Sequence, residues 1–72
     1  MGEEEVSGIC AQARIALAAS PVYAMRQLSV EQVGNSVVLT GRVPSFYQKQ
    51  MAQEIVRHAV AELELVNSID VD

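Results

Sequence analysis

Few residues of this chain are of a type that could perform chemistry, and they are scattered along the sequence. Ser45 opens an apolar segment, His58 is the single histidine, and Cys10 is the single cysteine. A nucleophilic serine or cysteine needs a base beside it, and a structural zinc ion usually takes four ligands, whereas one Cys and one His supply two. We therefore expect no catalytic residue, no metal site and no cofactor, and we expect the chain not to be an enzyme.

Ordinary structural roles account for the serine and the histidine. Ser45 and Gln48 fit the S-x-x-Q capping box, in which a serine hydroxyl accepts a hydrogen bond from a backbone N–H at the start of a helix. His58 falls on the polar side of that helix, four residues from Glu54 and four from Glu62, so a solvated histidine is expected.

The stretch 37–56, VVLTGRVPSFYQKQMAQEIV, changes from a two-residue apolar period to a spacing of three and four. It therefore predicts a strand that leads into a helix. A phosphate-binding loop at such a join needs several glycines, so that backbone amides can reach the anion. The only glycine in this stretch is Gly41, inside the predicted strand, and we expect it to let a helix approach the sheet closely.

Composition limits the class of protein. The 72 residues form one domain at most, and a net charge of −4 argues against avid nucleic-acid binding. No run approaches the roughly 18 apolar residues of a membrane span. Residues 1–5 are expected to form an acidic lead-in to a domain over 6–72. The sequence shows no secretory signal. Because the chain could be cut from a longer protein, its localisation stays open.

The first predicted helix covers about residues 4–19. Its apolar residues recur at three and four positions, and the residue before proline avoids helical dihedrals, so Ser20-Pro21 ends it. The apolar face consists of Val6, Ile9, Cys10, Ala13 and Leu17.

A hairpin is predicted next. Gly34-Asn35 is a two-residue loop with glycine first, which favours a type II′ turn. The residue numbers of any two residues that face each other across this turn add up to 69. Val30 therefore faces Leu39, and Leu28 faces Gly41. The apolar residues of the two strands then lie on the same side of the hairpin, which supports this register.

A second helix from Ser45 and a last strand over residues 65–71 complete the order αββαβ. We expect an α+β fold, a two-layer sandwich with two helices on one face of a three-stranded mixed sheet. A right-handed crossover makes the last two strands parallel. The third strand could pair with the first or the second. The predicted core comprises Leu17, Leu28, Val30, Leu39, Ile55, Ala59 and Ile69.

Three segments in this order resemble the BON domain, a family named for bacterial osmotically induced and nodulation proteins. They are V-x-L-x-G-x-V over residues 37–43, a helix of the form S-x-x-x-x-x-x-A-x-x-I-V over 45–56, and L-V-N-x-I-x-V over 65–71. The resemblance covers about residues 5–72. The chain departs from the family at its hairpin, where Gly34-Asn35 replaces Asn-Gly or Asp-Gly, and before the last strand, where AELEL replaces Gly-Val.

The resemblance implies a non-catalytic interaction module of αββαβ order. It implies weak binding of phospholipid or of other partners in the bacterial periplasm or cell envelope. The alternative is a protein–protein interaction or regulatory domain of a larger bacterial protein, without lipid contact. An RNA-binding module would need a G-x-x-G loop, which this sequence lacks. The oligomeric state stays open.

The predicted topology separates the charges. Arg26, Arg42 and Lys49 fall at the end of the molecule where the second helix begins, and we expect a weak anionic contact there. The hairpin end collects most of the acidic residues, and two aspartates blunt the basic end. The acidic residues in question are Glu3, Glu4, Glu5, Glu31, Glu62 and Glu64 at the hairpin end, and Asp70 and Asp72 at the basic end.

Ile15 is the candidate for a contact with another protein domain. It lies opposite the apolar face of the first helix, beside Ala11, Ala18 and Ala19. Together these residues form a shallow apolar strip, and an exposed apolar patch is a possible protein-binding surface.

Overall fold

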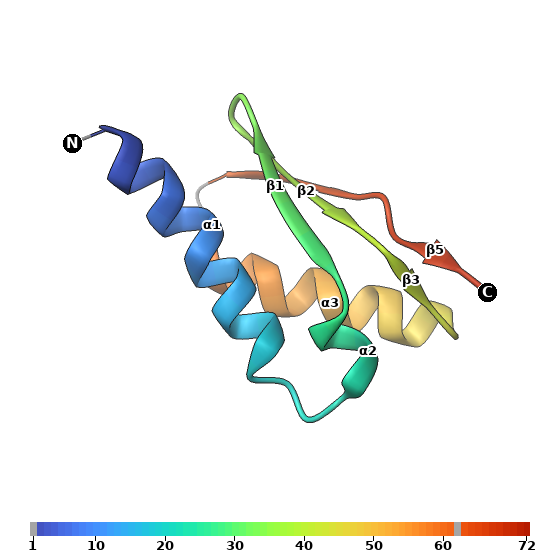
Figure 1. Cartoon of the computed structure of the whole chain (residues 1–72). Helices are drawn as coiled ribbons and strands as arrows, with labels where there is room; N and C mark the ends of the chain where they lie inside the picture. The colour runs from blue at the N-terminus through green and yellow to red at the C-terminus, as the bar shows by residue number, and fades with distance from the viewer. Residues whose placement is uncertain (1, 62) are drawn as a thin grey trace.

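The computed structural model describes residues 2–61 and 63–72, and the side chains from Cys10 onward. Figure 1 shows the helices on one face of a twisted sheet, so the α+β prediction is confirmed. The elements in chain order are α1 (Gly2–Ala18), α2 (Tyr23–Arg26), β1 (Ser29–Val33), β2 (Ser36–Thr40), β3 (Arg42–Val43), α3 (Phe46–Ala59), β4 (Glu64–Asn67) and β5 (Asp70–Val71). The division of the chain into a lead-in over 1–5 and a domain over 6–72 stays a prediction.

The hairpin has the predicted register. Val30 pairs with Leu39 and Val33 pairs with Ser36 in the antiparallel β1–β2 ladder. Gly34 has a φ of 60°, and the described non-glycine residues have no positive φ, so Asn35 follows with an ordinary one. This combination is the type II′ pattern, which glycine adopts at its first central position without steric cost.

The third strand pairs with the second, which answers the question that the sequence left open. The main sheet has the order β1-β2-β4, with β4 parallel to β2. Ser36 pairs with Glu64 and Val43 pairs with Val71, an offset of 28 residues in both cases. The β2–β4 and β3–β5 pairs therefore form one parallel ladder, interrupted near Gly41.

The sequence predicts two helices, and the structure adds a third, the four-residue α2. Its Met25 is completely buried in the core. The segment leading to it is held by a hydrogen bond from the Val22 N–H to Ser20 Oγ, 3.1 Å. A helix of one turn is too short to show a helical period, so the apolar spacing gave no sign of it.

The core is aliphatic and lies between the helices and the sheet. Leu17, Val30, Leu39 and Ile69 are buried as predicted. Leu28, Ile55 and Ala59 were also predicted to be buried and are only partly so, because they pack at the margin of the core rather than inside it. The other buried apolar residues are Cys10, Ala13, Met25, Val37, Val43, Ala52, Val56 and Val60.

Gly41 faces Leu28, as the register predicts, but the expected close approach of a helix is wrong. A Cβ atom at position 41 would lie 2.7 Å from Leu28 Cδ2, so the crowding comes from the side chain of the residue just before β1. Gly41 also has a φ of 136°, which other residues rarely adopt. Both facts require glycine here, and neither involves a ligand.

Ser45 caps α3 as predicted. The Gln48 N–H donates to Ser45 Oγ over 3.2 Å, which satisfies one of the free donors of the first turn. The reciprocal half of the capping box is absent, because Gln48 Oε1 is buried without a hydrogen-bond partner. The single-sided cap still fixes the residue at which α3 begins.

Candidate interaction surface

The aromatic residues of this chain lie on its surface rather than in its core. Tyr23 is 68% exposed, Phe46 is 75% exposed and Tyr47 is 76% exposed. The chain contains two tyrosines, one phenylalanine and no tryptophan, so these three are its complete set. Aromatic side chains normally supply much of the buried apolar area of a small domain. Their placement outside the core therefore marks this region as a candidate surface for binding.

Two elements place these aromatic side chains at one end of the molecule. The Ser45 cap makes Phe46 and Tyr47 the first two residues of α3. Tyr23 begins α2, which contacts both α3 and β3. Figure 1 shows α2 close to the middle of α3. We call Tyr23, Phe46 and Tyr47, together with Arg26, the aromatic end.

Arg26 belongs to this end through its contact with Tyr23. Its guanidinium carbon lies 5.5 Å from the centroid of the Tyr23 ring, within the range of a cation–π interaction. The arginine is exposed, so the contact orients the side chain without removing its charge from water.

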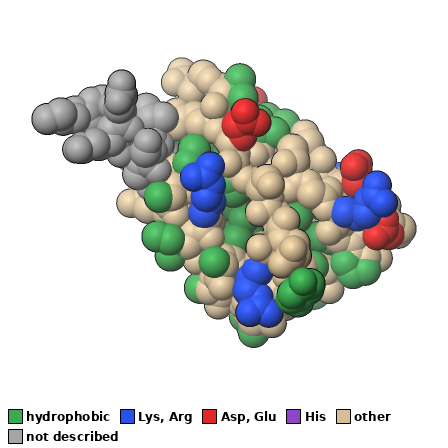
Figure 2. Space-filling model, in the orientation of Figure 1, with side chains coloured by type: hydrophobic (Ala, Val, Ile, Leu, Met, Phe, Trp, Pro, Cys, Tyr) green, Lys and Arg blue, Asp and Glu red, His purple; other side chains and the backbone are tan. Residues whose placement is uncertain are grey.

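The other two predicted cations do not converge with Arg26 on one face. Arg42 forms an ion pair with Asp72, with Nε and Oδ1 3.3 Å apart and both side chains mostly exposed. Lys49 is half-buried and lies two positions after Tyr47, which places it on the other side of α3. Figure 2 shows the same separation, because the Lys and Arg side chains visible on that face lie apart from one another. Their role as an anionic contact stays a prediction.

The predicted acidic end is only partly within the described structure. Glu31 and Glu64 are exposed on β1 and β4. Glu62, and the side chains of the glutamates at positions 3–5, lie outside the described residues. At the opposite end, the Arg42–Asp72 pair shows that an aspartate offsets a basic side chain there.

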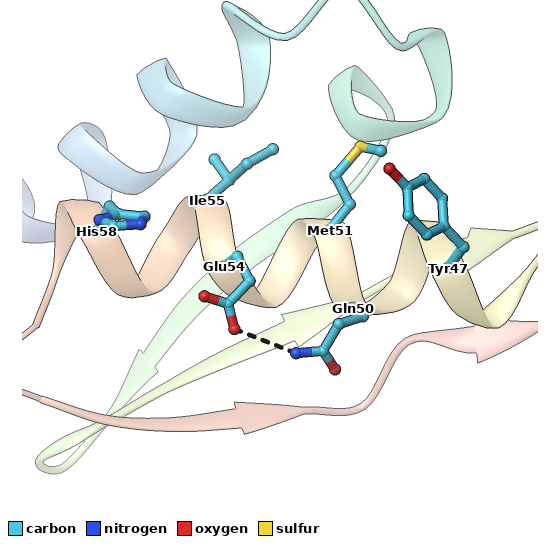
Figure 3. Close-up of a pocket in the computed structure, with 6 residues that line it drawn as sticks. All are labelled: Tyr47, Gln50, Met51, Glu54, Ile55 and His58. Carbon is cyan, nitrogen blue, oxygen red and sulfur yellow. Dashed lines mark hydrogen bonds between the residues drawn. The ribbon is translucent and has the colours of Figure 1, made fainter.

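The structure has a groove on the outer side of α3 that the sequence did not predict. It has a volume of about 320 Å³, and its lining residues recur along one side of the helix. Figure 3 shows Met51 and Ile55 pointing toward the side where α1 and α2 lie, while Gln50 and Glu54 form the other wall and are joined by a hydrogen bond of 3.1 Å. The lining residues are Tyr47, Gln50, Met51, Glu54, Ile55 and His58. We call this feature the α3 groove.

His58 lies at the far end of the α3 groove and is exposed, on the polar side of the helix as predicted. Positions 47, 51, 54 and 58 follow the spacing of one helix face, so the stripe could have been recognised from the sequence. Every lining residue belongs to α3, so the depth of the groove depends on how these side chains are arranged along the helix. Within residues 2–61 and 63–72, no three His, Cys, Asp or Glu side chains are grouped to hold a metal ion.

Among the residues that the structure describes, none of the helices has the length and apolar character needed to cross a membrane.

A model of the BON domain family matches residues 7–72, nearly the whole chain. The chain belongs to the BON domain family. No curated protein matches it. BON domains are generally binding modules rather than enzymes, and the resemblance seen in the sequence is confirmed.

In this BON domain the asparagine of the L-V-N-x-I-x-V segment holds α3 against the sheet. Asn67 Nδ2 donates to the Lys49 carbonyl over 3.0 Å and to Gln53 Oε1 over 3.2 Å. Asn67 Oδ1 accepts from the Ile69 N–H over 3.2 Å. One side chain thus joins the end of β4 to the middle of α3. We expect these contacts to restrain the rotation of α3 and with it the direction in which Tyr47 points.

Ile15 of this BON domain is 67% exposed, on the outer side of α1. Ala18 and Ala19 beside it are exposed, and Ala11 is half-buried. Arg14, from the same helix, donates from Nη2 to the Val30 carbonyl over 3.0 Å and so holds α1 to β1. The apolar strip is therefore presented on a fixed helix, and its role as a partner contact stays a prediction.

Proposed function

We propose that this BON domain is a non-catalytic module that binds the surface of an anionic phospholipid bilayer weakly, through its aromatic end. The observation that supports this proposal is the exposure of Tyr23, Phe46 and Tyr47 beside Arg26. Tyrosine rings favour the region between water and hydrocarbon, because one end of the ring is apolar and the other is wet. The phenylalanine ring adds apolar area that a bilayer surface can cover.

The cations add a weak attraction to this contact. Each basic side chain near an anionic bilayer contributes about 1 kcal/mol, and salt reduces the effect over a Debye length. Arg26 is available at the aromatic end, while Arg42 on β3 and Lys49 on α3 lie on other faces and add only a longer-range attraction. The Arg42–Asp72 ion pair is exposed, and exposed pairs contribute little, so lipid phosphate can replace Asp72 as the partner of Arg42. The net charge of −4 keeps the total attraction small.

A bilayer titration tests this function. Amide chemical shifts are followed while vesicles of phosphatidylglycerol, or of phosphatidylcholine as the uncharged reference, are added at low salt. We expect shifts centred on residues 23–26 and 42–49, larger with the anionic vesicles and reduced by added salt. Shifts centred on Gly34-Asn35, or none at all, would contradict the proposal.

Phe46→Ala provides the sharper version of this test. It removes an exposed ring that does not line the α3 groove, and we expect it to weaken vesicle binding about threefold to tenfold, in line with the loss of up to one buried aromatic side chain. Val33→Ala is the matched control, because Val33 is also exposed and apolar but lies next to the hairpin turn. Equal losses from both variants would show that binding does not depend on the aromatic end.

The exposure of Ile15 supports a second candidate function, in which the module binds another protein domain through α1 and makes no lipid contact. In that case vesicles leave the amide shifts unchanged, and a partner or a second copy perturbs residues 11–19. The two candidates therefore predict shifts in different helices.

A further inference from the structure

The free edge of β4 presents backbone groups that no other strand of the described residues pairs with. The Ser68 N–H donates to the Leu39 carbonyl over 2.9 Å, and β4 is parallel to β2, so the even-numbered residues of this segment face β2. The backbone groups of successive residues in a strand alternate in direction, so the N–H and C=O groups of Leu65 and Asn67 point away from the sheet. Figure 1 shows this C-terminal segment along the outer edge, beyond β2 and β3.

The other edge of the main sheet, along β1, is closed. Val30 is 4% exposed, and its carbonyl accepts the hydrogen bond from Arg14, so α1 covers the middle of that strand. By contrast, Leu65 and Asn67 are half-buried, and Val66 between them is 39% exposed. The accessible edge is therefore that of β4.

One side of α3 lies above the free edge of β4. Asn67 donates to the Lys49 carbonyl and to Gln53 Oε1, which places positions 49 and 53 over the end of the strand. Arg57 lies one turn further along the same side of α3 and is exposed, since residues four apart share a helix face. Because α3 ends shortly before β4 begins, Arg57 lies toward Leu65. Lys49 and Arg57 therefore border this edge, and the ion pair found among the described residues involves neither of them.

A strand added at this edge has two different faces. Side chains opposite Leu65 and Asn67 lie on the α3 side of the sheet, where two cations favour carboxylates. These cations are Lys49 and Arg57. A side chain opposite Val66 lies on the other side of the sheet, where an apolar β-branched residue packs against the exposed valine. The edge therefore selects a sequence in which acidic and β-branched residues alternate.

We propose that the free edge of β4 binds an extended segment of a partner protein in which acidic residues alternate with β-branched apolar residues. Peptide N–H and C=O groups complete the open ladder, which neither a lipid nor a helix can do. The bound segment is short, because the next N–H group along the edge, that of Ile69, already donates to Asn67 Oδ1. The proposal goes beyond the bilayer contact and uses a different side of α3.

A second copy of the domain is a poorer occupant by the same criteria. In a two-fold pairing of β4 with β4, the sides of the two α3 helices that carry Lys49 and Arg57 face each other, and like charges repel. The second copy also places a leucine and an asparagine, rather than carboxylates, beside these cations. The carboxylate of Glu64 does not change this, because it lies on the opposite side of the sheet, where it accepts a hydrogen bond from Ser36 Oγ over 3.4 Å.

A blocked hexapeptide of alternating glutamate and valine is the probe. It is titrated into the intact domain at low salt with amide chemical shifts as the readout, and shifts are expected in residues 49–57 and 64–68. Two control peptides of equal length have lysine in place of glutamate, or the same composition with the glutamates contiguous. Both controls should bind about fivefold more weakly, because each loses exposed ion pairs with α3. Equal binding of either control would overturn the assignment.

Methylation of the peptide backbone tests the ladder itself. N-methylation of one central glutamate should weaken binding about tenfold, because in an antiparallel strand, the more stable arrangement, that N–H donates to β4. N-methylation of the adjacent valine should have little effect, since its N–H points away from the edge. Equal effects at the two positions would show that the peptide binds without pairing, and the proposal would fail.

Arg57→Gln tests the contribution of α3. It should weaken peptide binding about twofold to fivefold, the effect of one exposed ion pair, and should leave vesicle binding unchanged. Arg26→Gln is the matched control, because it removes the same charge from α2 and should weaken vesicle binding while the peptide affinity stays unchanged. Equal losses of peptide affinity from the two variants would overturn the α3 contact without affecting the bilayer proposal. Self-association of the domain that the peptide reverses in sedimentation would identify a second copy as the occupant and likewise overturn it.

Discussion

The interior and the exterior of this BON domain use different kinds of apolar residue. Within the described residues, the buried set is aliphatic apart from Cys10 and Met25, and includes Leu17, Leu39 and Ile69. Every aromatic ring of the chain lies outside, on α2 and at the start of α3. The core is therefore complete without the largest apolar side chains. The difference indicates that the aliphatic residues serve stability, while the aromatic residues are available for binding.

The largest expected effect comes from Leu39→Ala. Leu39 is completely buried in the central strand, so truncation leaves a cavity and should lower the free energy of unfolding by about 2–5 kcal/mol. Urea denaturation measures this change. Phe46→Ala is the paired variant, and its free energy of unfolding should stay within about 0.5 kcal/mol of the parent, since the ring is exposed. Similar losses from the two variants would break the contrast between interior and exterior.

A smaller effect is expected from Asn67→Ala, which removes the side-chain hydrogen bonds between β4 and α3. The variant removes three hydrogen bonds and should cost about 1–3 kcal/mol, chiefly because the Ile69 N–H loses its acceptor. Ser68→Ala, at an exposed neighbouring position, is the control. We also expect amide shifts in the first half of α3, around Tyr47. Shifts confined to the last strand would show that Asn67 does not orient the aromatic end.

The smallest effect on stability is expected from Ile15→Lys. The side chain is mostly in water, so the free energy of unfolding should change by less than about 0.5 kcal/mol. If the apolar strip on α1 is a protein contact, sedimentation at high concentration should show self-association that this variant abolishes. A parent that stays monomeric, with no partner shifts in residues 11–19, leaves Ile15 as an ordinary surface residue.

The features that depend on local sequence could be predicted, and those that depend on distant neighbours could not. Gly34-Asn35 and the alternation around it determine the hairpin register, and Ser45 determines where α3 begins. Whether β4 pairs with β1 or β2 depends on the path of the crossover, which no short motif reveals. The role of Asn67 depends on the carbonyl of Lys49, which is 18 residues away in sequence.

The candidate interaction surface also combines features that could be predicted from the sequence with features that could not. The residue types at the aromatic end are evident from the sequence, but their exposure is not, because aromatic residues in an apolar pattern normally predict a core. The separation of Lys49 from Tyr47 follows from helix geometry alone and could have been foreseen. The stripe that lines the α3 groove follows from helix spacing, but its hollow depends on side-chain conformations, which spacing does not reveal.

The hydrogen bond between Asn67 and Ile69 also affects how copies of this domain meet in solution. The N–H groups of Ser68 and Asp70 donate to the neighbouring strand, so the intervening N–H of Ile69 points toward the outer edge of the ladder. Asn67 Oδ1 already accepts a hydrogen bond from that N–H group. An extended strand from another molecule therefore meets an interrupted row of donors and cannot continue the ladder past this point. The C-terminal strand is thereby a poor template for edge-to-edge aggregation.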